Sequence, residues 1–169
     1  MDFDEVIEKR YSVRGFLDKP VSKEDLNYIL KAATIAPTGV NFQPFKVYVI
    51  DAKKYKEELK EIYSPDWFSD APIVLAVVGL KDEAWVRKYD DYNIVDIDGT
   101  IVMDHMILAA TNRGLGTCYI GAFKPEKARE FLKLADNEVP VLFTPLGYPD
   151  AEPRDTPRKP IDEFTVYID

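Results

Sequence analysis

The feature that most constrains the fold is a stretch at residues 98–112 in which apolar side chains recur at nearly every position. On a helix they cover almost the whole circumference instead of a single stripe. A helix that is apolar on all sides lies in a core or in a subunit interface. Gly114 follows where a helix commonly places its terminal glycine. The stretch therefore predicts a central helix packed on several sides. Its apolar members are Ile101, Val102, Met103, Met106, Ile107, Leu108, Ala109 and Ala110.

Strands are predicted on both sides of that helix in the sequence. Residues 73–79 (IVLAVVG) form a continuous, β-branched run, which is typical of a central strand buried on both faces. Residues 46–50 (KVYVI) and 139–148 (VPVLFTPLGY) also have strand character, and residues 117–121 (TCYIG) enter another strand. The prolines of 139–148 predict a strand at a sheet edge or on a bulged path.

Further helices have recognisable starts. Asp2 with Glu5 forms a capping-box pattern, and Ser22 with Asp25 repeats it before a helix that Pro37 ends. Short helices are expected at residues 55–62 and 125–132, the second with its proline in the first turn. Residues 81–93 are polar and aromatic and show no period.

The last part of the chain predicts an extended arm. Residues 149–160 (PDAEPRDTPRKP) contain four prolines and no core residue. Residues 164–168 then alternate between apolar and polar side chains, the period of a half-buried strand that is free to pair with a second subunit. We therefore expect one α+β domain over residues 1–169, a mixed sheet flanked by helices. Within it, residues 148–169 form the arm and a terminal strand that reaches a partner in an intertwined homodimer.

Length and charge exclude several classes of function. At 169 residues the chain buries a sizeable core, and a net charge of -8 argues against nucleic-acid and anionic-membrane partners. The longest apolar run, residues 73–78, is too short to span a bilayer, and the acidic N-terminus does not resemble a secretory signal. Cys118 is the only cysteine, which excludes an internal disulfide and favours a reducing, cytoplasmic location.

Two basic clusters stand out in this acidic chain. KRYSVRGF, residues 9–16, places Arg10, Ser12 and Arg14 where the first helix ends, and TPRKP places Arg158 and Lys159 before the last strand. Forked guanidinium donors together with a hydroxyl suit a phosphate, which carries nearly two charges at neutral pH. The alternatives are surface arginines paired with nearby carboxylates and a solvated arm. If the clusters converge, they form one anion site.

A third polar segment, APTGVNFQPF at residues 36–45, follows the second helix. It offers Thr38, Gly39, Asn41 and Gln43. Side-chain amides carry both donors and acceptors, so they can bind the edge of a heteroaromatic ring. The alternative is a helix-to-strand connection with capping polar groups, which explains Gly39 and Asn41 well and Gln43 less well.

Other candidate sites are weaker. GLGTCYIG, residues 114–121, lacks the glycine spacing of a dinucleotide fingerprint and follows a helix instead of preceding one. Cys118 is expected to be a small core residue, and His105, the only histidine, to pack; we therefore predict no metal site and no catalytic dyad. Several aromatic residues are candidates for a flat pocket, or for core or interface packing: Trp67, Phe68, Trp85, Tyr89 and Tyr92.

Taken together, these segments resemble the FMN-dependent nitroreductase family over nearly the whole chain. The resemblance lies in KRYSVRGF, in APTGVNFQPF, in DIDGTIVMDHMILAATNRGLGTCYIGAF (residues 96–123), in TPLGYP (residues 144–149) and in PRKP. Each segment alone is a weak signal. Their shared order and compatible spacing make the combination strong.

The resemblance implies a homodimer with two FMN molecules at the subunit interface. Residues near the N-terminus would contact the phosphate, the ribityl chain and the pyrimidine edge: Arg10, Tyr11, Ser12 and Arg14. Arg158 would close on the phosphate, with Lys159 beside it. Residues of the other subunit would approach the same flavin: Pro37, Thr38, Gly39, Asn41 and Gln43. The backbone of Ile120 and Gly121 would lie beside the ring, within reach of N5.

The resemblance also implies an activity. NADH or NADPH would give a hydride to flavin N5, and a flat acceptor such as a nitroaromatic or a quinone would then take it, in ping-pong order. Arg14 would stabilise negative charge on the ring, and water would supply protons, since no general acid stands out. The short region between residues 62 and 96 predicts a small lid. One alternative is an FMN-binding protein with little turnover, for storage, sensing or partner interaction; another is a small α+β domain that binds a different phosphate compound.

Overall fold

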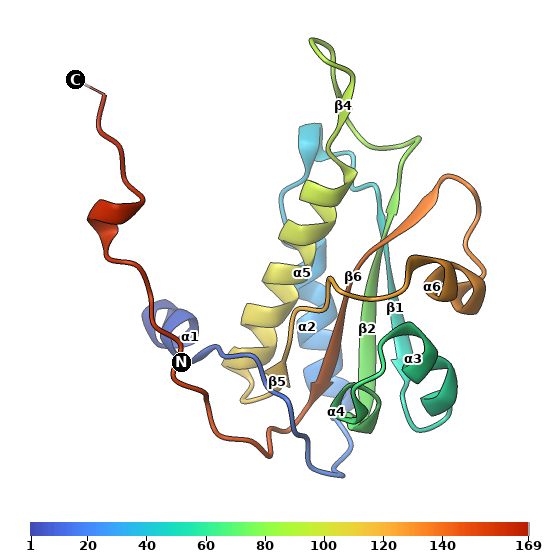
Figure 1. The fold of residues 1–169 in the computed structure, drawn as a ribbon, viewed down its shortest axis with the longest axis vertical. Coiled ribbons are helices and arrows are strands. Elements are labelled where there is room, and N and C mark those ends of the chain that lie inside the picture. Colours follow the sequence, from blue (N-terminus) through green and yellow to red (C-terminus); the bar gives the residue numbers. More distant parts are fainter. Residues whose placement is uncertain (169) are drawn as a thin grey trace.

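The computed structural model describes residues 1–168, and these form three layers (Figure 1). A four-stranded sheet lies between two groups of helices, α2 and α5 on one face and α3, α4 and α6 on the other. The elements, in chain order, are α1 (Phe3–Lys9), α2 (Lys23–Ile35), the short 3-10 helix η1 (Gly39–Asn41), β1 (Phe45–Asp51), α3 (Lys56–Ile62), α4 (Asp66–Asp70), β2 (Ile73–Leu80), β3 (Val86–Arg87), β4 (Tyr92–Asn93), α5 (Val95–Asn112), β5 (Gly116–Thr117), α6 (Pro125–Leu132), β6 (Glu138–Gly147) and the 3-10 helix η2 (Ile161–Glu163).

The sheet has the order β1-β2-β6-β5, and each of its ladders is antiparallel. The expected mixed sheet is therefore a wrong prediction, because parallel pairing in the described chain is limited to a single bridge between Ser12 and Thr117. A continuous apolar run like that of β2 is common in parallel sheets because helices cover both of their faces. Here helices cover both faces of an antiparallel sheet, and the same run results.

The strand β2 is central and buried on both faces, as its sequence predicts. Val74, Ala76 and Val78 pack into the core beneath α3, α4 and α6. Leu75 and Val77 point to the other face and pack against α2 and α5. Alternation along one strand thus joins the two cores, and this strand fixes the relative position of the helical layers.

The strand β6 follows the bulged path that its prolines predict, but it does not lie at an edge. It pairs with β2 on one side and β5 on the other. Val77 is opposite Leu142 and Val78 is opposite Pro140, so Val141 is the extra residue of a bulge. Proline is accommodated here because the ladder is already interrupted.

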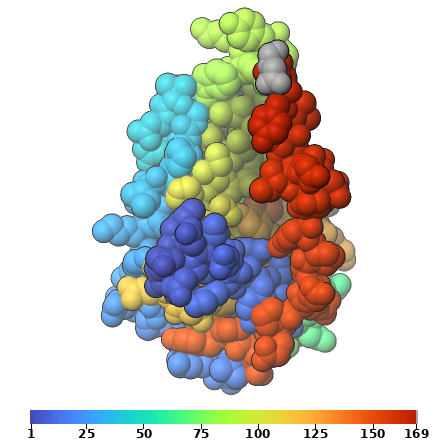
Figure 2. All heavy atoms as spheres, turned by 90° about the vertical axis from the view of Figure 1, so that its left-hand side faces the viewer, coloured from blue at the N-terminus to red at the C-terminus, as the bar shows by residue number. Residues whose placement is uncertain are grey.

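The helix α5 is the long apolar helix expected from the sequence. It begins at Val95, slightly earlier than predicted, and Gly114 follows it with a φ of 71°. It packs against α2 and against β2 and β6. Its apolar circumference is only partly covered within one chain, because Ile101 and Leu108 are half-buried and Ile97 is 45% exposed. Residues of this helix remain visible between the N-terminal part and the C-terminal arm in Figure 2.

The ends of the shorter helices are also confirmed. Asp2 and Glu5 form the reciprocal bonds of a capping box on α1. Ser22 caps α2 through the backbone N–H of Asp25, and Pro125 occupies the first turn of α6. The region between β2 and α5, which has no sequence period, contains the short hairpin of β3 and β4.

The C-terminal arm is extended, as expected, and runs away from the body of the molecule (Figure 1). The predicted strand at residues 164–168 does not form within the chain; η2 and irregular backbone occupy this end. Its apolar side chains face solvent, with Val166 84% and Ile168 96% exposed. A strand needs a neighbour for its backbone groups, and the arm carries this segment away from the sheet of its own chain. Asp169, the last residue of the predicted arm at residues 148–169, lies outside the described residues.

Candidate functional site

Backbone and side-chain bonds bring the two ends of the chain together. The hydroxyl of Tyr11 donates to the carbonyl of Ala151 at 2.7 Å, and the N–H of Asp150 donates to the carbonyl of Gly15 at 2.9 Å. On its other side, the N-terminal segment is bound to β5, where the N–H of Val13 donates to the carbonyl of Thr117 at 2.9 Å. The N-terminal segment therefore lies between the sheet and the proline-rich arm.

A polar cavity of about 590 Å³ opens between this segment and the arm. Such a volume is within the usual range for small-molecule and cofactor sites. Residues of both basic clusters of the sequence analysis line this cavity. The lining residues are Glu8, Arg10, Tyr11, Ser12, Arg14, Pro153, Arg154, Asp155, Thr156 and Arg158.

The arginines of the cavity have no carboxylate partner in the part of the chain that the structure describes. Arg10, Arg14, Arg154 and Arg158 form no ion pair among residues 1–168. Asp18, a carboxylate close in sequence to the first cluster, pairs with Lys53 on the surface instead, at 2.5 Å. These arginines are therefore not the ion-paired surface residues of the alternative interpretation. Their donors are available to an anion.

Arg154 lines the cavity and is absent from the sequence prediction. It precedes Arg158 by four positions in the proline-rich arm. Because an extended arm has no helical or strand period, spacing alone gave no reason to choose Arg154. The available signal was the basic character of PRDTPRKP taken as a whole.

Arg14 stands over an aromatic ring. Its guanidinium carbon lies 5.8 Å from the centroid of the Trp67 ring, and Nη1 donates to the carbonyl of Ser12 at 3.4 Å. Trp67 itself packs edge-on against Tyr63 at 5.7 Å and lies at the border of the core, next to the cavity residue Arg14. Stacking of this kind holds a guanidinium in place without neutralising its charge.

Tyr119 and Asp104 form a half-buried, hydrogen-bonded pair near Arg10, and no sequence pattern indicated this pair. The hydroxyl of Tyr119 donates to Oδ1 of Asp104 at 2.8 Å. Loss of water around the half-buried ring, together with this bond to a carboxylate, raises the pKa of Tyr119 above its ordinary value, and the charge of Arg10 opposes the rise. The phenol consequently stays protonated at neutral pH.

The backbone of Ile120 and Gly121 lies immediately downstream of the contact between Val13 and Thr117. Ile120 is buried and exchanges hydrogen bonds with Phe143, at 2.9 Å and 3.1 Å. Gly121 is exposed, and its N–H forms no hydrogen bond within residues 1–168. Neither residue lines the polar cavity, and neither does Lys159.

The third polar segment is not part of this cavity in a single chain. η1 lies at the end of α5 opposite to α1 (Figure 1), and the N–H of Gly39 donates to Oδ1 of Asp98 in the first turns of α5 at 2.9 Å. Asn41 and Gln43 are exposed, with Nε2 of Gln43 donating to Oδ1 of Asn41 at 3.2 Å. Pro37, Thr38 and their neighbours line none of the cavity wall.

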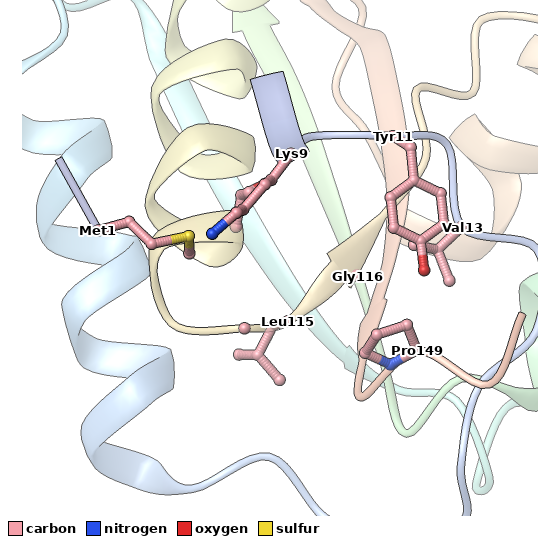
Figure 3. Close-up of a pocket in the computed structure, with 9 residues that line it drawn as sticks. Met1, Lys9, Tyr11, Val13, Leu115, Gly116 and Pro149 are labelled. Carbon is pink, nitrogen blue, oxygen red and sulfur yellow. The ribbon is translucent and has the colours of Figure 1, made fainter. Parts of the chain in front are cut away.

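A second, smaller pocket of about 170 Å³ lies beneath α1, beside the start of β5 (Figure 3). Lys9 of the first basic cluster faces this pocket, and its ammonium is paired with Glu5 at 3.3 Å. Most of the lining is apolar, as Val13, Leu115 and Pro149 show. Apolar walls and a single neutralised cation do not suit a phosphate, so Lys9 is separate from the arginine site.

Cys118, His105 and the aromatic candidates were weaker site candidates in the sequence, and most of them pack or form hydrogen bonds within the fold. Cys118 is buried, and its N–H donates to Oγ1 of Thr144 at 3.0 Å. His105 is half-buried, with Nδ1 3.0 Å from the carbonyl of Ile101 in its own helix. Of the aromatic candidates, Phe68 is in the core, whereas Tyr89 is 97% exposed on the hairpin. Over residues 1–168, acidic, histidine and cysteine side chains form no cluster able to hold a metal ion, and no helix has the length and hydrophobicity to cross a membrane.

Comparison with known proteins agrees with this arrangement. A model of the nitroreductase family matches residues 7–67 and 63–148. A solved structure of a nitroreductase family protein from Clostridium difficile superposes with a TM-score of 0.92 at 38% identity, covering 99% of this chain and 98% of that one.

Curated relatives agree with the family match. A Streptococcus pyogenes protein named as an NAD(P)H nitroreductase is 27% identical over 96% of this chain and 98% of its own length. An FMN reductase [NAD(P)H] of Bacillus subtilis is 27% identical, with 88% of this chain and 66% of that protein covered. The family resemblance of the sequence motifs is therefore confirmed: this chain belongs to the nitroreductase family.

Proposed function

We propose that the protein is a homodimeric, FMN-dependent oxidoreductase that takes a hydride from NADH or NADPH and delivers it to a flat acceptor such as a nitroaromatic or a quinone. The enzyme class and the cofactor follow from family membership and from the relatives named as NAD(P)H nitroreductase and FMN reductase. The acceptor class, the order of the reaction and the roles of individual residues are the proposed part. A cytoplasmic setting, in keeping with one buried cysteine, belongs to the same proposal.

The observation that carries the proposal is the cavity lined by four arginines, none of which forms an ion pair with another described residue. FMN ends in a phosphomonoester of nearly two negative charges, and binding it requires several donors. Arg10, Arg154 and Arg158 would hold the phosphate, together with the hydroxyl of Ser12. The chemistry of this donor set fits the cofactor, because guanidinium groups recognise phosphate oxygens in pairs.

Two further groups suit the ring of the cofactor. Arg14, held over Trp67, would place positive charge beside the pyrimidine edge, where it stabilises negative charge that develops during reduction. The free N–H of Gly121 is an available donor to a ring nitrogen. Bound FMN supplies the electron transfer, by accepting a hydride at N5 and passing it on, while the protein contributes placement and charge.

The loop of residues 37–43 requires a second copy of the chain in this proposal. It lies outside the cavity in one chain and exposes the amides of Asn41 and Gln43. The partly uncovered apolar surface of α5 and the exposed apolar end of the arm are suitable contacts for a partner. The long free edge of the sheet, β1, is a suitable acceptor for residues 164–168 of the partner.

A single spectroscopic experiment tests the proposal. Protein purified without added cofactor, or after incubation with FMN, should be yellow, and NADH or NADPH should bleach the flavin band without oxygen. Adding a quinone or a nitroaromatic should restore the band, and initial rates should give the parallel double-reciprocal lines of a ping-pong reaction.

The alternatives predict different spectra. An FMN-binding protein with little turnover would be yellow but would not be bleached by either nucleotide. A colourless protein that takes up no FMN would contradict the cofactor site and favour a domain for another phosphate compound.

A further inference from the structure

Asp98 is an unusual residue in this protein. It is 1% exposed, and its Oδ1 accepts the N–H of Gly39 at 2.9 Å. Among residues 1–168, its Oδ2 is the single buried side-chain oxygen or nitrogen that has no hydrogen-bond partner. No cation in the described chain forms an ion pair with Asp98. Its position near the N-terminus of α5 is favourable for an acidic side chain because of the helix dipole. Burying a carboxylate oxygen that has no hydrogen-bond partner is unfavourable for folding, so the presence of Asp98 calls for another reason.

The segment that Asp98 contacts has a strained backbone. Val40, Asn41 and Gln43 have φ values of 52°, 59° and 51°, in the left-handed region. This conformation is unfavourable for any residue with a Cβ, and most of all for a β-branched one such as Val40. Strained residues persist only where surrounding contacts hold them, and they concentrate at functional sites.

Most hydrogen bonds of this segment are internal to it. The N–H of Asn41 donates to the carbonyl of Thr38 at 3.0 Å, and the N–H of Gln43 donates to Oγ1 of Thr38, also at 3.0 Å. These bonds close the turn but do not attach it to the rest of the molecule. The bond from Gly39 to Asp98 joins the start of the turn to α5.

Packing around Gly39 also attaches the start of the turn to the rest of the molecule. A Cβ at this position would lie 2.5 Å from Cδ1 of Ile94 and 3.0 Å from Cβ of Trp85. The backbone of Gly39 is therefore in close contact with Ile94, which precedes α5, and with Trp85, which precedes β3. This close approach places its N–H on the carboxylate, and a residue with a Cβ would fit only if the end of the Ile94 side chain and Trp85 moved.

We propose that Asp98 is a positioning residue for the cofactor site. Its carboxylate fixes the N–H of Gly39, holds residues 37–43 in the strained turn, and so keeps the amides of Asn41 and Gln43 aimed outward to bind FMN. The anchoring of the turn stands on the geometry of this chain alone. The effect on FMN rests on the proposed function.

The informative variant is Asp98→Leu, because leucine fills nearly the same space and cannot accept a hydrogen bond. The substitution removes the buried Oδ2, which has no partner among residues 1–168, and this is favourable; it also leaves the N–H of Gly39 without its acceptor, and this is unfavourable. Because the two effects oppose each other, we expect an unfolding midpoint close to that of the unmodified protein. At the same time, amide hydrogen exchange at Gly39 should become about tenfold faster, while exchange in β2 stays unchanged. FMN affinity should fall about tenfold, and the circular dichroism of the bound flavin should change.

Two matched variants complete the experiment, with dimer content checked in each by light scattering. Asp98→Asn keeps an oxygen that can accept the Gly39 N–H and is expected to restore slow exchange and FMN affinity to within about threefold of the unmodified protein. Thr111→Val removes a buried hydroxyl from the other end of α5, where Oγ1 donates to the carbonyl of Ile107 at 3.0 Å, and should change neither measurement.

The outcomes separate anchoring from cofactor binding. Unchanged exchange at Gly39 in Asp98→Leu would overturn the proposal, and so would faster exchange with unchanged FMN affinity. A lower unfolding midpoint with faster exchange throughout β2 would also overturn it, because Asp98 would then be needed for folding in general. If the unmodified protein takes up no FMN, the proposed function fails, whereas the exchange at Gly39 still decides the anchoring.

Discussion

At the residue scale, arginines from both ends of the chain face one cavity and have no ion pair among the described residues. Arg10, Arg14 and Arg158 were predictable, because cations concentrated in an acidic chain indicate a local anion site. Arg154 was not, since its role depends on the path of the arm. Tyr119 and Asp104 meet only through the packing of β5 and its following segment against α5.

Substitutions in the arm provide a direct test of the cavity. Arg154→Ala and Arg158→Ala should each weaken FMN affinity about tenfold or more, because a hydrogen bond to a charged group contributes about 1.5–3 kcal/mol. Fluorescence titration with FMN measures this. The loss should shrink at high salt, since exposed charges are screened.

Lys53→Ala is the matched control for these arginines, because Lys53 is an exposed cation outside the cavity, paired with Asp18. It should leave FMN affinity unchanged. Equal affinity in both arginine variants and this control would contradict the phosphate site.

The raised pKa of Tyr119 predicts how stability changes in alkali. The folded pKa lies above the ordinary value of 10.0, so the neutral phenol is favoured in the folded state. The contribution of the neutral Tyr119 phenol to the free energy of unfolding is complete below pH 10. It is lost as the pH rises further, because Tyr119 gives up its hydroxyl proton at a lower pH in the unfolded chain than in the folded protein. Tyr119→Phe should be less stable by about 1 kcal/mol at pH 8 and should lose less stability above pH 10.

Urea unfolding at a series of pH values checks this expectation. Tyr89→Phe, at an exposed position, should follow the unmodified protein throughout. If Tyr119→Phe and the unmodified protein lose stability in parallel above pH 10, the bond to Asp104 does not favour the folded state.

At the element scale, helix ends follow local chemistry closely. The capping box of α1, the serine cap of α2 and the first-turn proline of α6 were all predictable from a few residues. The end of α6 is an exception. Lys133 takes a left-handed conformation with a φ of 53°, where glycine is the usual residue.

The left-handed conformation of Lys133 predicts that glycine substitutions at the end of α6 and inside α6 change the stability of the protein in opposite directions. Lys133→Gly should stabilise the protein by about 0.5–1 kcal/mol, because it removes the cost of a Cβ in the left-handed region. Lys127→Gly, inside the same helix, should destabilise it by about 1 kcal/mol or more, since it lowers helix propensity and removes the ion pairs with Glu61 and Glu130. Denaturant midpoints decide between this pattern and a common loss, which would show that Lys133 is not strained.

At the scale of the whole molecule, the C-terminal arm is the part whose apolar side chains are least covered by the rest of its own chain. Its last residues alternate like a strand, yet they form none within the chain, and β1 leaves a long sheet edge unpaired. If residues 164–168 of one copy paired with β1 of a second copy, the backbone N–H and C=O groups of both segments would gain hydrogen-bond partners. It would also bring residues 37–43 of one chain toward the arginine cavity of the other.

Removing residues 164–169 should therefore shift the protein from dimer to monomer at micromolar concentration, as measured by light scattering. Val166→Asp should cause a similar shift, because a charge on the buried face of a strand opposes pairing. Asp162→Asn, in the preceding turn η2, is the control and should leave the dimer intact. A truncated protein that stays dimeric would rule out pairing through the arm.

The features that depend on neighbours along the chain were predictable from the sequence. They are most of the helices and strands, the central buried position of β2, the apolar circumference of α5 and the basic character of the site, because periodicity, capping and charge are local properties. The short helix α4 was not predicted. Tertiary packing set the antiparallel direction of the sheet, the interior position of β6, the meeting of Arg154 with the N-terminal arginines, and the contact of the Asp98 carboxylate with Gly39. Each of these joins residues far apart in sequence, and such contacts depend on how the layers pack.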